Sequence, residues 1–165
     1  MTRDHDTYQS THERLSAESY IPEQRLEVRP MVSVAEKGKK YMVVINGMKE
    51  SVVYAVDGNI VKDGQRCDKL VLVKRSEQGV EPEQWTEIFV ELKGRDTGHA
   101  IDQLRSTLEK PIFRHPSNDE IRARIVAQSF PSHKSNPTME KAKLEFRRKY
   151  HCDLRGMKTG QKDKL

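Results

Sequence analysis

The chain has few cysteines, few aromatic residues and no long apolar segment. Its 165 residues include two cysteines, and only 6% of them are aromatic. No apolar run approaches the roughly 18 residues that a membrane-crossing helix needs, and the first residues lack the apolar core of a secretory signal. These absences predict a cytoplasmic protein that does not bind a membrane.

The cysteine and histidine residues are too scattered for a zinc site. Cys67 and Cys152 lie far apart, so free thiols are the expectation in a reducing cytoplasm, although one disulfide could form. His115, His133 and His151 occur singly, without the short spacing of zinc ligands. A Gly-rich phosphate loop is also absent from the sequence. The sequence therefore predicts neither a zinc protein nor a Walker-type nucleotide-binding protein.

Positive charge is concentrated in the last part of the sequence. The whole chain carries a net charge of +5. From residue 134 onward ten lysines and arginines stand against four acids, whereas residues 1–30 hold four arginines and six acids. Such a basic segment is typical of proteins that contact phosphate groups, and Arg147, Arg148 and Lys149 are the candidate contacts. A solvated helix face explains the same residues equally well.

The length of the chain and the distribution of its polar residues predict one domain with a polar segment at each end. A chain of this size has room for one core. Residues 1–30 are polar and lack periodicity, which predicts a flexible or helical arm. Residues 31–157 are expected to fold as the domain, and residues 158–165 to form a basic tail.

Apolar patterns predict the elements of this domain. Strands at 41–45 and 51–56 are expected to pair across a tight turn at residues 46–47. Strands at 68–74 and 86–93 are close enough in sequence to form a hairpin. The later elements are a helix capped by Asp96 or Thr97 that ends before Pro111, a strand at 123–130, a helix from Asn136-Pro137 to residue 150, and a strand at 153–157. The expected fold is α/β (α+β), with a mixed sheet flanked by helices.

The strand at 86–93 carries an acid and a lysine on one face. Side chains alternate along a strand, so one apolar face holds Ile88, Val90 and Leu92. Glu91 and Lys93 share the opposite face. A buried acid or lysine costs free energy unless it is paired. These two could pair with each other at a sheet edge, or they could hold a metal ion and a water molecule.

Asp68 opens the preceding strand, and hairpin pairing would bring it beside Glu91. Two neighbouring carboxylates repel each other unless a cation lies between them. Mg²⁺ suits such a site because it takes oxygen ligands and binds through one or two carboxylates together with phosphate. A nearby lysine can stabilise the charge that develops on a phosphate. Asp68, Glu91 and Lys93 are thus the groups that phosphodiester hydrolysis requires.

An acid followed one strand later by Glu-x-Lys resembles the PD-(D/E)XK nuclease superfamily, and the resemblance covers about residues 41–157. It implies a restriction-endonuclease-like core in the order βββ(β)-α-β-α-β and a nuclease that uses Mg²⁺ or Mn²⁺. It also implies Asp68 and Glu91 as metal ligands, with Lys93 positioning water or stabilising charge. DNA as the favoured nucleic acid, a role in phage defence or restriction, and a homodimer follow from the same resemblance.

Several neighbours of this cluster are further candidates. Many relatives carry a glutamine on the helix after the lysine strand, and Gln103 matches that placement at the margin of the apolar stripe. An ordinary polar flank is the alternative. Asp96 falls on the same side, and His99 could act as an acid for the leaving oxygen or be a solvated residue at the helix start. Arg122 and Arg124 could reach the groove in which this cluster would bind nucleic acid.

The chain departs from the family pattern in two places. Cys67 stands where the family has a proline before the first acid. For the acid that some relatives supply from an upstream helix, the candidates are Glu36 and Glu50. Asp57 is a third acid that could lie near the site, and a turn explains it equally well.

Two other functions fit the same residues. A catalytically inactive nuclease fold could bind nucleic acid without cleaving it. A protein-interaction subunit could use its basic tail to meet an acidic partner. An active phosphodiesterase remains the principal expectation.

Overall fold

Three helices and seven strands form an α/β fold in the part of the chain that the computed structural model describes, residues 7–92, 96–129 and 137–165. The elements in chain order are α1 (Thr11–Ala17), β1 (Gln24–Glu36), β2 (Lys39–Ala55), β3 (Lys69–Lys74), β4 (Trp85–Glu91), α2 (Thr97–Leu108), the 3-10 turn η2 (Pro111–Phe113), β5 (Asn118–Ala127), α3 (Pro137–Tyr150), β6 (Cys152–Lys158) and β7 (Lys162–Lys164).

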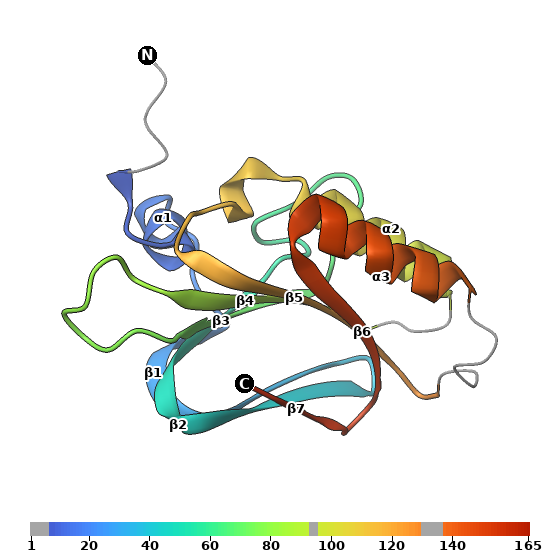
Figure 1. The fold of residues 1–165 in the computed structure, drawn as a ribbon, viewed down its shortest axis with the longest axis horizontal. Helices are drawn as coiled ribbons and strands as arrows, with labels where there is room; N and C mark the ends of the chain where they lie inside the picture. Colours follow the sequence, from blue (N-terminus) through green and yellow to red (C-terminus); the bar gives the residue numbers. More distant parts are fainter. Residues whose placement is uncertain (1–6, 93–95, 130–136) are drawn as a thin grey trace, which may run out of the picture.

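The strands form one mixed sheet in the order β1-β2-β3-β4-β5-β6, as predicted for the fold class. The pairs from β1 to β4 are antiparallel, whereas β4, β5 and β6 run parallel. The parallel strands are joined through α2 and α3, which lie side by side over the sheet (Figure 1). Strand β4 is therefore where the sheet changes from antiparallel to parallel pairing.

Each face of the sheet has its own core. On one face the three helices cover the central strands, and Leu15, Leu104 and Phe146 are completely buried there. On the other face the described helices contribute nothing to the core. The sheet instead curls, so that β1, β2 and β7 lie across from β4 and β5 (Figure 1), and Val43 packs with Ile88 between them. The predicted helices thus cover one face, and strands cover the other.

The N-terminal region differs from the predicted polar arm. Residues 24–36 form β1, which pairs with β2 along the edge of the sheet. Most of the first half of β1 is at least partly exposed to solvent on both faces, so polar residues suit it and apolar periodicity is absent. The helical alternative for the arm is met by α1, whose N-cap Ser10 accepts a hydrogen bond from the Glu13 amide at 3.1 Å.

The predicted hairpin at residues 41–56 is wrong. Residues 39–55 form the single strand β2, and the partner of its first half is β1. Gly47 and Met48 have φ values of +80° and +49°, so the chain bends there without reversing. The residues that predict a turn do mark a local distortion, but a bend within a strand uses the same residues as a turn between strands.

The predicted basic tail also differs, because its last residues form β7. This strand pairs in parallel with β2, where Lys162 lies opposite Met42. The hairpin of β3 and β4, the helix capped by Asp96 and the strand after α3 match the predictions. Asn136, His133 and the end of the predicted strand at 123–130 lie outside the described residues. In the described part of the chain, no helix has the length and apolar character needed to span a membrane.

Candidate active site at the end of the β3–β4 hairpin

The register of the hairpin places Asp68 beside Glu91. Lys69 lies opposite Val90, and the Asp68 amide donates to the Val90 carbonyl at 3.1 Å. One residue further, the Leu92 amide donates to Asp68 Oδ2 at 2.8 Å. The sequence predicted this neighbourhood from strand spacing alone.

Both carboxyl groups lie on the helix-covered face and are removed from solvent. Asp68 is 3% exposed and Glu91 is 0% exposed. The alternation predicted for β4 is present, since Phe89 belongs to the helix-side core and Ile88 and Val90 to the other. Placing two acids at such a position costs free energy that neutral residues would not cost.

Burial and the neighbouring Glu91 and Asp68 carboxyl groups affect the pKa of the Cys67 thiol. Burial raises its pKa, and the nearby charges of Glu91 and Asp68 raise it further. The hydrogen bond with Thr107 opposes this shift. A thiol with a raised pKa stays protonated, so Cys67 is a neutral packing residue and no nucleophile.

Hydrogen bonds of Thr107 hold helix α2 against the segment that precedes Asp68. The Cys67 amide donates to Thr107 Oγ1 at 2.9 Å, and that hydroxyl donates to the Gln103 carbonyl at 2.8 Å. Gln103 is one helical turn nearer the start of α2, toward the end of β4 where Glu91 lies. It is 9% exposed, and its Oε1 has no hydrogen-bond partner among the described residues. The residue expected at the margin of the helix is therefore buried against the sheet.

The other predicted acids have partners elsewhere. Asp96 is exposed and caps α2 by accepting from the His99 amide at 3.1 Å, and His99 itself is exposed. Asp57 pairs with Arg66 at 2.7 Å in a turn, which is its structural explanation. Lys93 follows β4 directly but lies outside the described residues, so its role stays a prediction.

The predicted phosphate contacts lie at the opposite end of the helix layer. Helices α2 and α3 run in the same direction, because Arg105 bonds Glu145 and Glu109, at the end of α2, bonds Lys149. Arg147, Arg148 and Lys149 at the end of α3 are thus far from the start of α2, and all three are exposed. They do not form part of the carboxyl cluster.

Arg122 and Arg124 belong to the other face of the sheet. Arg124 is 1% exposed, and its guanidinium donates to Asp163 Oδ2 at 2.7 Å and to the Asp153 carbonyl at 2.7 Å. Arg122 donates to the Lys164 carbonyl at 2.6 Å. The expectation that these arginines line the groove of Asp68 is wrong, because β5 alternates and turns them away from the helices.

The oxygen atoms at the corner suit a hard cation. Asp68 and Glu91 supply carboxylate oxygens and Gln103 an amide oxygen, which are ligand types of Mg²⁺ and Mn²⁺. Among the described residues, no group of three or more His, Cys, Asp or Glu side chains could hold a metal ion by itself. A divalent ion here would need the amide oxygen, water or a phosphate to complete its coordination.

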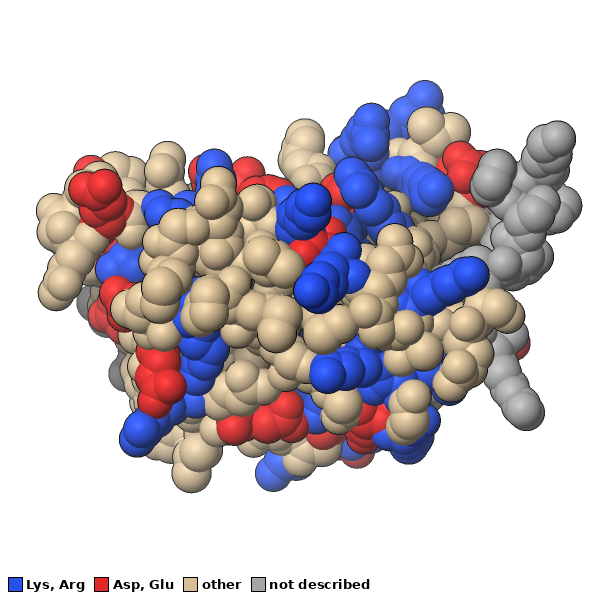
Figure 2. Space-filling model, turned by 90° about the horizontal axis from the view of Figure 1, so that it is seen from below, with Lys and Arg blue, Asp and Glu red and all other residues tan. Residues whose placement is uncertain are grey.

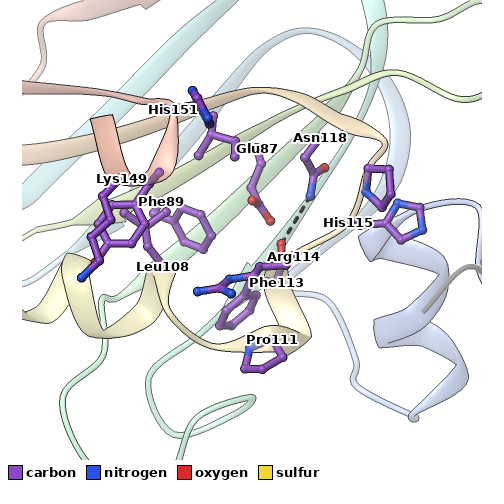
Figure 3. A pocket seen from close by; sticks show the side chains of 13 residues that line it. Glu87, Phe89, Leu108, Pro111, Phe113, Arg114, His115, Asn118, Lys149 and His151 are labelled. Carbon is purple, nitrogen blue, oxygen red and sulfur yellow. Dashed lines mark hydrogen bonds between the residues drawn. The ribbon is translucent and has the colours of Figure 1, made fainter. Parts of the chain in front are cut away.

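Sequence reasoning missed Glu87, which lies on the same face of β4 as Glu91. Glu87 is 2% exposed, and its Oε2 has no hydrogen-bond partner among the described residues. Burial raises its pKa well above the usual value, against the opposing charge of Arg14. Its side chain lies in a pocket of about 770 Å³ between the ends of α2 and α3 (Figure 3). The period-two spacing from Glu91 was the available signal.

The side of the molecule formed by β2 and β7 carries exposed basic side chains (Figure 2). Lysine and arginine side chains gather across the middle of this face (Figure 2). Lys162 and Lys164 of β7 are exposed there, and Lys40 of β2 is adjacent, since the Gly160 amide donates to its carbonyl at 3.0 Å. The basic end of the sequence is thus divided between α3 and this strand surface.

Comparison with protein-family models, with curated protein sequences and with solved structures finds no match for this chain. The candidate site therefore stands on its own residues and their geometry.

Proposed function

We propose that the protein is a metal-dependent nuclease that hydrolyses phosphodiester bonds of nucleic acid at the Asp68–Glu91 pair. The register of the β3–β4 hairpin carries the proposal, because it sets two buried carboxyl groups side by side on one face of the sheet. A cation between the two relieves their repulsion. The sequence pattern of these residues, with Lys93 next, is that of the PD-(D/E)XK superfamily.

Each residue of the corner has a proposed task. Asp68 and Glu91 would supply ligand oxygens, and the buried Gln103 Oε1 would accept from a bound water. Lys93 would stabilise charge on the phosphate or orient the attacking water. A bound Mg²⁺ or Mn²⁺ lowers the pKa of its water and neutralises charge on the scissile phosphate.

The order of elements is compatible with the restriction-endonuclease-like core. From β1 to β6 the chain follows strands, helix, strand, helix, strand, and the acid-bearing hairpin precedes the crossover to β5. The basic surface at β7 (Figure 2) and the exposed basic residues at the end of α3 support a polyanionic substrate. DNA, restriction or phage defence, and a homodimer rest on the family resemblance alone.

One observation favours a second candidate, a nuclease fold that binds nucleic acid without cleaving it. Glu91 has no exposed surface, and one oxygen of Asp68 already accepts a hydrogen bond from the Leu92 amide. A substrate phosphate needs access to at least one of these groups. If the corner does not open, the carboxyl pair can serve only the structure.

A cleavage assay separates the two candidates. The wild-type protein is incubated with single-stranded, duplex and branched DNA and RNA, with Mg²⁺, with Mn²⁺ and with chelator. We expect metal-dependent cleavage of at least one substrate. Glu91→Gln and Lys93→Ala should each lower the rate by about 10²-fold or more, and Gln103→Ala by about tenfold. Glu77→Gln, an exposed change on the β3–β4 loop, is the control.

Thermal unfolding of every variant checks that lost activity is not lost folding. Absence of cleavage on all substrates, with salt-sensitive binding retained, would contradict the nuclease and support the binding module. Absence of both cleavage and binding, together with capture of a protein partner that resists high salt, would point to the interaction subunit.

A further inference from the structure

The pocket around Glu87 has the chemistry of a nucleotide-binding site. It lies at the N-terminal ends of β4, β5 and β6, between the ends of α2 and α3. Glu87 and Glu91 are four residues apart on one strand, so the pocket is about 13 Å from the carboxyl pair. The pocket is therefore a separate site, and binding of a ligand there does not depend on the proposed nuclease activity.

The walls of the pocket are apolar and partly aromatic. They include Phe89, Leu108, Phe113, Ile121 and Tyr150. Phe89 and Phe113 meet edge to face, with ring centroids 5.5 Å apart. A volume of about 770 Å³ is ample for a ligand of nucleotide size. Such walls suit a planar ring.

On the floor of the pocket, two polar atoms have no hydrogen-bond partner among the described residues. Glu87 extends from β4 toward the middle of the lining residues, between Phe89 and Asn118 (Figure 3). Its Oε2 has no hydrogen-bond partner among the described residues, and neither has Asn118 Oδ1. Both residues are at least nine-tenths buried. Buried polar atoms in native proteins are nearly always paired, so two such atoms on one floor need a partner from outside.

The orientation of Asn118 is determined by its amide nitrogen. Nδ2 donates to Thr11 Oγ1 at 2.8 Å and to the Phe113 carbonyl at 3.4 Å. A carbonyl can only accept, so the nitrogen must face it and Oδ1 is left as an acceptor. Glu87 in its protonated form offers one donor and one acceptor. The floor therefore presents one donor and two acceptors.

An amino-bearing nucleobase matches this floor. Adenine and cytosine each have an amino group beside a ring nitrogen acceptor. The ring nitrogen can accept from the Glu87 hydroxyl, while the two amino hydrogens are donated to the Glu87 carbonyl oxygen and Asn118 Oδ1. Uracil has only one ring N–H, so it leaves one acceptor of the floor unpaired.

The rim of the pocket is cationic. Arg114 and Lys149 line it and are exposed, and His151 is exposed beside them (Figure 3). Arg114 forms no ion pair with any described residue, whereas Lys149 pairs with Glu109 at 3.0 Å. A phosphate attached to a base on the floor would reach this rim and meet Arg114 first.

We propose that this pocket binds a nucleotide with an adenine or cytosine base, the base on Glu87 and Asn118 and the phosphate at Arg114. The nucleotide is either free in solution or an unstacked nucleotide of a strand. Both sources present the same base edge and phosphate.

Calorimetric titration of the full chain with AMP, CMP, UMP, adenosine and inorganic phosphate tests this assignment. AMP and CMP should bind about tenfold more tightly than UMP. Glu87→Leu should weaken AMP about 10- to 100-fold, whereas Glu87→Gln keeps a donor and an acceptor and should bind AMP nearly as wild type does. Arg114→Ala should weaken AMP severalfold and leave adenosine unchanged. Lys158→Ala, an exposed change on β6, is the control.

The outcomes are separable. Thermal unfolding of the Glu87→Leu variant checks that it is folded, and a folded Glu87→Leu protein that binds AMP like wild type would overturn the proposal. Equal binding of inorganic phosphate and AMP, or no binding at millimolar AMP, would overturn it too. A single-stranded oligonucleotide that displaces AMP assigns the strand as the source, and failure to displace it assigns the free nucleotide.

Discussion

Asp163 and Glu87 are buried carboxyl groups on opposite faces of one sheet, and they differ in the hydrogen-bond partners that the described residues offer them. Asp163 Oδ2 accepts from the Tyr41 hydroxyl and from Arg124 Nε, each at 2.7 Å. Its Oδ1 accepts from the Lys164 amide at 3.0 Å. Glu87 is also buried, but its Oε2 has no hydrogen-bond partner among the described residues.

The two environments shift acidity in opposite directions. Burial acts against ionisation of Asp163, yet Arg124 and the hydrogen bonds hold its pKa below the usual value. Burial raises the pKa of Glu87 well above its usual value. The comparison teaches that a buried acid with a full set of donors is a structural group. A buried acid with a raised pKa that lines a pocket is available to a ligand.

Removing Arg124, the arginine that bonds Asp163, should have the largest effect on stability. Arg124→Met removes the closer of the two arginines that pair with Asp163, leaving Arg122 at 3.5 Å from Asp163 Oδ1, and breaking a buried pair typically costs about 3–5 kcal/mol. We expect that loss in the free energy of unfolding measured with urea. Arg155→Met, an exposed change that removes a second contact of Asp153, is the control. A loss below about 1 kcal/mol for Arg124→Met would mean that the network does not support this face.

Neutral substitution of the two acids should separate them directly. Asp163→Asn removes the charge that Arg124 and Tyr41 are arranged to meet, so we expect a loss of about 2–3 kcal/mol in unfolding free energy. The raised pKa of Glu87 favours its protonated form, so Glu87→Gln should change stability by less than about 1 kcal/mol. Equal losses in the two variants would show that Glu87 is charged in the folded protein.

The same contrast predicts opposite pH dependences. The ordinary pKa of a glutamic acid is 4.5, and above that pH the unfolded chain loses the Glu87 proton. The folded chain keeps it because its pKa is raised, so stability should fall as pH rises. Asp163, whose pKa is lowered, contributes stability that is present above the ordinary pKa of 3.8 and is lost as pH falls through the lowered pKa. Urea unfolding from pH 3 to 8 should show a flatter upper limb in Glu87→Gln and a flatter acid limb in Asp163→Asn. Unchanged limbs would contradict the assignment of the two groups.

The smallest effect is expected at the partly exposed ion pair between the helices. Arg105 bonds Glu145 through two nitrogens at 2.7 Å, but both side chains are about one-third exposed. Solvent screens such a pair, so Arg105→Ala should lower the unfolding free energy by about 0.5 kcal/mol. The loss should shrink in 1 M salt. A larger, salt-independent loss would show that this pair resembles the buried network more than a surface contact.

The local parts of the candidate site could be predicted from the sequence. Asp68 and Glu91 belong to one hairpin, and both the pairing of its strands and the alternation of β4 follow from residues that are close in the chain. Gln103 could be found because the helix start at Asp96 gives its register. Its burial depends on Thr107 contacting Cys67, which a helical pattern does not contain.

The remaining features depend on contacts between distant residues. Polar β1 is a strand only because β2 is its neighbour, and no apolar alternation in its first half signals that pairing. From the sequence alone Arg124 could be a phosphate contact. Its partner Asp163 lies 39 positions later in the chain, so no local pattern reveals the pair. The pocket around Glu87 includes Arg114, whose carbonyl accepts from Arg14 across 100 positions of the chain. None of these pairings has a local pattern.

The return of β7 to β2 also sets an order of events in folding. The contact between Tyr41 and Asp163 joins residues 122 positions apart, and closing so long a loop costs roughly 4 kcal/mol of chain entropy. The β3–β4 hairpin closes a far shorter loop and can form early. The corner that holds Asp68 and Glu91 is then assembled while the opposite face of the sheet is still open. We therefore expect the Arg124–Asp163–Tyr41 network to form late in folding.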